Sequence, residues 1–107
     1  MFAQVTNLVK YVNPISGTAA STTASALKHG TAEANFGSTI PSVCTPFAMT
    51  QWTPQTQASE TKCIPPYYYK DDSFSGFRGS HWISGSCMQD YGSLTIMPIS
   101  GKLKTTG

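Results

Sequence analysis

Charged side chains are scarce in this chain of 107 residues. Seven Lys and Arg stand against five Asp and Glu, which gives a formal net charge of +2. So small and scattered a charge argues against a nucleic-acid partner, because phosphates require clustered basic side chains. No apolar run approaches the ~20 residues that span a bilayer, so no membrane partner is expected either. The composition predicts a soluble chain of at most one domain.

Motifs of several enzyme and metal-binding classes are also missing. Cys44, Cys63 and Cys87 include no C-x-x-C pair, which excludes the ligand spacing of a zinc site. They leave two arrangements open: one disulfide with a free thiol, as in an exported protein, or three buried thiols. Phosphate-loop and dinucleotide fingerprints do not occur. No Gly-x-Ser-x-Gly lies between a strand and a helix, where a nucleophilic serine requires it.

The most distinctive stretch is residues 67–97, in which aromatic and polar side chains are interspersed with glycines. Glycine and serine disfavour a helix, so the run predicts loops that present a surface between flanking strands. Aromatic faces beside hydrogen-bonding groups suit a sugar, which has apolar CH faces and a rim of hydroxyls. The alternative is an irregular β-protein whose aromatic side chains fill a core.

The rest of the chain predicts short strands separated by turns. Apolar spacing in residues 5–12 favours a helical turn, which Pro14 ends, and residues 15–18 form a turn. Residues 19–26 are Ser, Thr and Ala, a composition that suits a linker or a close backbone contact, and we expect an exposed or ligand-lining loop. Prolines interrupt residues 39–52, which are therefore expected to form an edge strand or a pair of short strands with a bend. Residues 51–54 are expected to end in a turn, and residues 94–97 to form one more strand. No helix of ordinary length is expected after Val12, so the pattern predicts an all-β sandwich.

Four segments occur in a recognisable order: YVNPISGT (residues 11–18), HGTAEANFGSTIPSVCTPFAMTQWTPQT (29–56), YYYKDD (67–72) and FRGSHWISGSCMQDYGSLTIMP (77–98). Their landmarks are an Asn-Pro-x-x-Gly-Thr opening, a Pro-Phe-x-Met-x-Gln strand followed by Thr-Pro-x-Thr, then Ser-Gly and Asp-Tyr-Gly. Together they resemble the amino-terminal region of glycoside hydrolase family 92, the calcium-dependent exo-acting α-mannosidases. The resemblance covers most of the chain.

This resemblance implies that residues 1–107 are a truncated part of an amino-terminal β-sandwich (supersandwich-like) domain in a larger two-domain glycoside hydrolase. Such a protein is secreted or periplasmic and hydrolyses mannosides of glycans. The linkage that it cuts is expected to be of the α-1,2 type. Its partners are a mannose-containing glycan and a helical catalytic domain of the same protein, which supplies the acid, the base and the calcium ligands. The fragment alone is then expected to be inactive. A stand-alone carbohydrate-binding module without catalysis is the alternative.

Candidate site residues follow from the same reasoning. Asp71 and Asp72 are adjacent, so in an extended strand they point to opposite faces and cannot form a catalytic pair. In family 92, loops of the sandwich contribute to the subsite for the leaving sugar. On that basis we expect substrate contacts, and no catalytic residue, among five side chains: Arg78, His81, Trp82, Gln89 and Asp90.

Each candidate also has a structural interpretation. Trp82 could be a core residue beneath Ile83, Arg78 could pair with Asp72 or Asp90, and Asp90 could form a turn before Gly92. The chain departs from the family at one point: His81-Trp82-Ile83-Ser84-Gly85-Ser86-Cys87-Met88 stands where many members carry Thr-His-Leu-Ser-Gly-Thr-Gly-Cys. The histidine of the family motif therefore aligns with Trp82, which puts the preferred leaving group and linkage in question.

Overall fold

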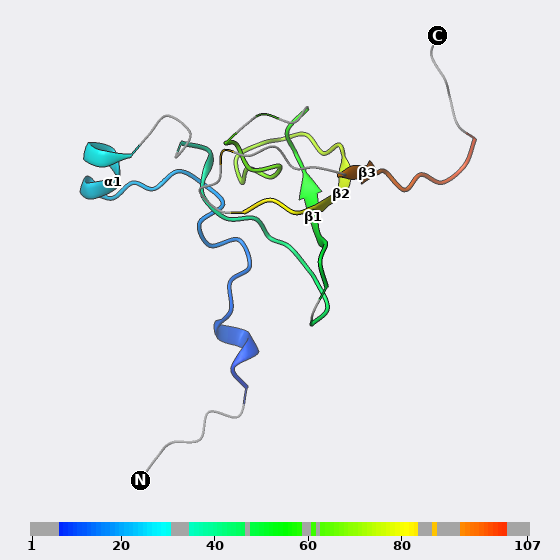
Figure 1. Cartoon of the computed structure of the whole chain (residues 1–107), viewed down its shortest axis with the longest axis horizontal. Helices are drawn as coiled ribbons and strands as arrows, with labels where there is room; N and C mark the ends of the chain where they lie inside the picture. Colours follow the sequence, from blue (N-terminus) through cyan, green and yellow to red (C-terminus); the bar gives the residue numbers. More distant parts are fainter. Residues whose placement is uncertain are drawn as a thin grey trace.

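The computed structural model describes residues 7–30, 35–46, 48–58, 61, 63–83, 87 and 93–102. The elements in chain order are η1 (Val9–Tyr11), α1 (Ala24–His29), β1 (Gln51–Gln55), β2 (Gly76–Ser80) and β3 (Leu94–Ile96). The three strands form one antiparallel sheet in the order β1-β2-β3, and α1 lies apart from it (Figure 1). Neither helix in the described part of the chain has the length and apolarity needed to cross a membrane.

One face of the sheet is polar and is buried at β1 and β2. The antiparallel register places Thr53, Arg78 and Thr95 side by side across the three strands. Thr53 and Arg78 are buried, as are Gln55 and Ser80 on the same face. Buried polar groups require hydrogen-bond partners. Thr95 Oγ1 supplies one such bond, donating to Gln55 Oε1 at 2.6 Å.

The opposite face of the sheet is apolar and uncovered. It carries Trp52, Phe77, Leu94 and Ile96, whose side chains range from 38% exposed at Trp52 to 55% at Leu94. Among the described residues, Trp82 is the large hydrophobic side chain that is buried. The radius of gyration is 16.9 Å, against about 13 Å for a compact domain of this length. The described residues therefore do not close a hydrophobic core over this face.

The segment after β1 is held to the sheet by backbone hydrogen bonds. Thr56 N and Gln57 N donate to Pro66 O at 2.9 and 3.3 Å, and Pro65 and Pro66 are buried. Further along, Ser75 N donates to Gln55 O at 2.8 Å just before β2 begins. The long connection from β1 to β2 thus returns to the end of β1 before it enters the sheet.

The amino-terminal segments confirm two of the expectations. η1 lies within the predicted helical turn, and Pro14 follows it. The predicted turn at residues 15–18 forms, with Thr18 N donating to Ile15 O at 3.2 Å. It packs against Gly37, whose φ is +82° and where a Cβ would lie 2.7 Å from Gly17 O. Only glycine fits so close an approach. The predicted strand at residues 94–97 is likewise found, as β3.

The central strand was not predicted. β2 lies in the glycine-spaced run that we expected to form loops, so that part of the prediction is wrong. Hydrogen bonding of β2 to both β1 and β3 offsets the conformational entropy that its glycines lose in a strand. At Gly79 the missing side chain also makes room, because a Cβ there would lie 3.2 Å from Thr50 Cγ2, closer than most Cβ contacts.

The predicted strand and turn in residues 39–54 are also corrected. Before β1 begins, the described residues of this segment show one isolated pairing, between Val43 and Trp52. Pro41 and Pro46 have no N–H to donate to a ladder. The expected turn at residues 51–54 is instead strand β1, and Pro54 is tolerated because β1 is an edge strand.

Helix α1 corrects the loop expected at residues 19–26. Thr23 Oγ1 accepts a hydrogen bond from Ala26 N at 3.2 Å and caps the helix. Alanine, leucine and lysine then favour it. The helix is only six residues long.

Candidate functional site

Arg78 lies in the middle of β2 on the polar face of the sheet. Its side chain is 5% exposed, and Nη2 donates to Ser93 Oγ at 2.7 Å. A buried guanidinium requires polar partners, and this bond joins β2 to the residue that precedes β3. The described residues show no ion pair between Arg78 and Asp72, which is exposed. Asp90, the other partner considered, lies outside the described residues.

His81 and Trp82 follow β2 directly and differ in exposure. His81 is exposed, with Nε2 lying 3.3 Å from Thr50 Oγ1. Trp82 is 9% exposed, and its backbone N–H donates to Ser80 Oγ at 3.0 Å. Its indole Nε1 is buried, and no group in the described part of the chain accepts a hydrogen bond from it. Ile83, which we considered as a cover for Trp82, is 70% exposed.

The other two candidates, Gln89 and Asp90, lie outside the described residues. Arg78, His81 and Trp82 come from β2 and the residues that follow it. Whether all five gather around one ligand therefore stays a prediction.

The three cysteines are in the first of the two arrangements left open by the sequence. Cys63 and Cys87 form a disulfide, and Cys44 is a free, exposed thiol. The disulfide links the connection between β1 and β2 to the connection between β2 and β3. The alternative of three buried thiols is excluded.

Two of the acidic residues are described, Asp71 and Asp72. Asp71 Oδ2 accepts hydrogen bonds from Thr56 Oγ1 at 2.6 Å and from Gln57 Nε2 at 2.7 Å, so its carboxylate has a structural role. Nowhere in the described ranges do three His, Cys, Asp or Glu side chains gather as metal ligands. The described residues therefore do not fit a calcium site, and we derive no chemical step from one.

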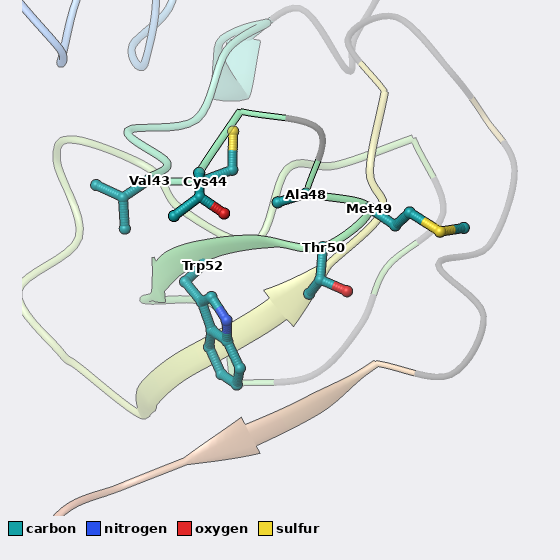
Figure 2. Close-up of a pocket in the computed structure, with 7 residues that line it drawn as sticks. Val43, Cys44, Ala48, Met49, Thr50 and Trp52 are labelled. Atoms are coloured by element: carbon teal, nitrogen blue, oxygen red, sulfur yellow. The ribbon is translucent and has the colours of Figure 1, made fainter.

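An open hollow lies beside Thr50, the partner of His81. Its volume is about 500 Å³, and its described lining consists of Val43, Cys44, Thr45, Ala48, Met49, Thr50 and Trp52. Figure 2 shows these side chains around the bend where residues 43–50 lead into β1. Val43 and Trp52 close it through two backbone hydrogen bonds of 2.9 Å. The described lining is mainly apolar and has no carboxylate, so it can receive an apolar group but supplies no acid or base.

The sequence pattern of the glycosyl hydrolase family 92 N-terminal domain matches residues 11–107. The chain belongs to this family. The family 92 domain is also similar to the solved structure of an inverting mannosidase of family 92 from Bacteroides thetaiotaomicron, at 34% sequence identity and with a TM-score of 0.65. The match covers 94% of this chain and 12% of the mannosidase chain. Comparison with curated proteins finds no match.

These likenesses confirm the resemblance and the fold class. The family 92 domain is all-β and forms part of a β-sandwich domain, with a three-stranded antiparallel sheet in its described residues. It spans about an eighth of the length of the mannosidase that it resembles.

Sequence reasoning missed three features of the family 92 domain near the candidate residues. Thr50 contacts His81, and Ser93 accepts from Arg78, across separations of 31 and 15 residues. The pairing of Cys63 with Cys87 spans 24 residues. Nothing in local periodicity marks such contacts, although an odd number of cysteines did signal one possible disulfide.

Proposed function

We propose that the intact protein is an exo-acting α-mannosidase of the α-1,2 type that hydrolyses mannosides of glycans. The observation that carries this proposal is the 34% identity to an inverting mannosidase over 94% of the chain. In this proposal residues 1–107 are the amino-terminal β-sandwich segment of a larger two-domain glycoside hydrolase. They form part of the leaving-group subsite and dock against the helical catalytic domain.

The uncovered face of the sheet supports the docking role. Trp52, Phe77, Leu94 and Ile96 form a continuous apolar surface, and Phe74 extends it with an edge-to-face contact to Phe77 at 5.3 Å between ring centroids. A sheet that presents an apolar face gains stability by packing it against another layer. The remainder of the same protein is the occupant that we propose, because the domain spans 12% of a similar family member.

The substrate-binding residues of the proposal are Arg78, His81, Trp82, Gln89 and Asp90. Trp82 is included because it directly follows the exposed His81, and no group in the described part of the chain accepts a hydrogen bond from its buried indole Nε1. His81 is included because its imidazole is exposed beside Thr50 and can bind a hydroxyl.

Hydrolysis itself is assigned to the remainder of the protein. An inverting glycosidase requires an acid and a base on opposite sides of the scissile bond, with their carboxyl groups ~6.5–9.5 Å apart. Asp71 is engaged by Thr56 and Gln57 and does not suit either role. We place both carboxyl groups and the ligands of the expected calcium ion outside this chain, so the chain alone is inactive.

The disulfide supports a secreted or periplasmic location. Cys63 and Cys87 are bonded, and disulfides persist in oxidising compartments but are rare in the cytosol. This location also fits an enzyme whose proposed substrates are mannose-containing glycans.

The test is hydrolysis by the full-length protein of α-1,2-, α-1,3- and α-1,6-linked mannobiosides, before and after chelation and return of calcium. Release of mannose that requires calcium and favours the α-1,2 linkage supports the proposal. Binding of mannobiose without hydrolysis would favour the carbohydrate-binding module instead. Failure both to bind and to hydrolyse would refute both.

Two substitutions of Trp82 test its role within the same assay. Trp82→Phe keeps an aromatic face and removes the Nε1–H donor, so we expect KM to rise about fivefold, the equivalent of one hydrogen bond. Trp82→Ala removes the face as well, and kcat/KM should fall more than tenfold. Leu27→Ala, on the exposed side of α1, is the control. Equal kinetics of all four proteins on every mannobioside would remove Trp82 from the subsite.

A further inference from the structure

Of the two tryptophans in the chain, Trp52 has the larger open surface. It is 38% exposed, against 9% for Trp82. In the register of the sheet Trp52 lies opposite Gly79, and a Cβ at Gly79 would lie 3.4 Å from Cη2 and 3.6 Å from Cζ2 of the indole. The missing side chain at Gly79 therefore lets the indole reach over β2, while part of the indole stays exposed.

A polar pair lies next to Trp52 on the same face of the sheet. Thr50 precedes Trp52 by two residues, and its Cγ2 atom lies 3.2 Å from the same Cβ position at Gly79. Figure 2 shows the side chains of Thr50 and Trp52 on the same side of the chain where it enters β1. Thr50 Oγ1 lies 3.3 Å from Nε2 of the exposed His81. A threonine hydroxyl has one donor and two acceptor sites, so this contact leaves capacity for a ligand hydroxyl.

The hollow beside this pair has the composition of a site for an uncharged ligand. Thr50 and Trp52 both line it, and its described lining contains no Asp, Glu, Lys or Arg. Its volume of about 500 Å³ lies within the range of about 300–1,000 Å³ that is usual for ligand pockets, which are mainly apolar with a few polar groups. A pyranose has an apolar CH face for the indole and hydroxyls for the polar pair, and it carries no charge.

We propose that this hollow binds a pyranose of the glycan, with the Trp52 indole stacked on the face of the sugar and with Thr50 and His81 hydrogen-bonded to its hydroxyls. The inference rests on the proposed function, and it adds Trp52 and Thr50 to the leaving-group subsite. Trp52 also belongs to the uncovered face of the sheet. The bound sugar therefore borders the surface on which the remainder of the protein docks in the proposed function.

The test uses the full-length protein and two substrates, an α-mannobioside and α-mannosyl fluoride, whose leaving group is a fluoride ion and not a sugar. Trp52→Leu keeps an apolar side chain and removes the aromatic face, so we expect KM for the mannobioside to rise about five- to tenfold. Thr50→Val keeps the shape and removes the hydroxyl, and it should raise the same KM about threefold. KM for the fluoride should not change in either variant. Leu27→Ala, on exposed α1, should match the wild type with both substrates.

Cys44 provides a second test that leaves the sheet unaltered. Its free thiol is exposed and lines the hollow. N-ethylmaleimide alkylates a thiol by forming an S–C bond across its C=C bond, and the proton goes to the neighbouring carbon. The added group should obstruct the hollow and raise KM for the mannobioside roughly fivefold or more in the wild type, with no change in Cys44→Ser. Mannobiose should slow the alkylation of Cys44, followed by peptide mass spectrometry.

An unchanged KM for the mannobioside in Trp52→Leu would overturn the inference, and so would an equal rise of KM for both substrates, which indicates a general loss of structure. If Trp52→Leu does not fold, Thr50→Val and the alkylation of Cys44 decide in its place. If the wild type hydrolyses no mannobioside, the proposed function has failed separately. Calorimetric titration of the full-length protein with mannobiose then decides. Binding that is weaker in the folded variants than in Leu27→Ala supports a sugar site in the hollow, whereas equal binding or none overturns it.

Discussion

Thr56 is the side chain on which the β1–β2 connection depends most directly. It is 8% exposed, and its Oγ1 makes two hydrogen bonds at once. It donates to Asp71 Oδ2 at 2.6 Å and accepts from Tyr68 N at 2.9 Å. Replacing it with valine keeps the shape of the side chain and removes both bonds.

The cost of Thr56→Val follows from these two contacts. A hydrogen bond to a charged carboxylate contributes about 1.5–3 kcal/mol, and leaving the Tyr68 amide without an acceptor costs about 1–3 kcal/mol. Asp71 keeps its bond from Gln57 Nε2, which limits the loss on the carboxylate side. We therefore expect Thr56→Val to lower the free energy of unfolding by about 3 kcal/mol. Thr56→Ser keeps the hydroxyl, loses one methyl group and should cost about 1 kcal/mol.

The assay is urea unfolding of the full-length protein, following the transition that contains this domain, together with amide exchange at Tyr68. We expect the midpoint to fall in the order wild type, Thr56→Ser, Thr56→Val, with an unchanged slope. The Tyr68 amide should exchange fastest in the valine variant. If valine destabilises the domain no more than serine does, the hydroxyl network does not hold the connection and the reasoning is wrong.

Two further substitutions test close packing and the uncovered sheet face. Gly37→Ala should cost about 2 kcal/mol or more, because a Cβ there would lie 2.7 Å from a backbone carbonyl at a φ of +82°. Gly101→Ala, at a φ of +88° with nothing within 4 Å, should cost only the strain of the left-handed backbone, about 1 kcal/mol, and equal thermal shifts would rule out the clash at Gly37. In the full-length protein Phe77→Ala should cost about 2–3 kcal/mol by urea unfolding, because under the proposed docking the remainder of the protein buries its half-exposed ring. A change within 0.5 kcal/mol, the range expected of Leu27→Ala on exposed α1, would show that this face stays open to solvent.

Local sequence patterns predicted the structure correctly where contacts between residues close in sequence decide the conformation. The turn at residues 15–18 forms through bonds between near neighbours, including Ile15 N to Asn13 Oδ1 at 3.1 Å. The alternation in residues 94–97 correctly marks β3. Helix α1 could also have been found, because Thr23 at the start of an alanine-rich segment is a good N-cap.

Local patterns failed where a partner distant in sequence decides the conformation. Gly76–Ser80 has the composition of a loop and becomes the central strand because β1 and β3 pair with it on both sides. Pro54 suggests a turn and instead lies in β1, because its missing N–H faces the open edge of the sheet. Residues 39–50 have the apolar side chains of a strand, yet in their described part Val43 alone finds a pairing partner.

The order of its motifs along the chain was enough to assign this domain to family 92 and to an all-β fold, because motif spacing and strand-forming side chains are properties of the covalent chain. Which face of the sheet is polar and buried, which is apolar and uncovered, and which two cysteines meet were decided by the tertiary structure. These depend on strand register, and a shift of one residue would exchange the two faces. Arg78 illustrates both: its sequence context marked it as a candidate, and only the pairing of β2 with β3 put its guanidinium beside Ser93.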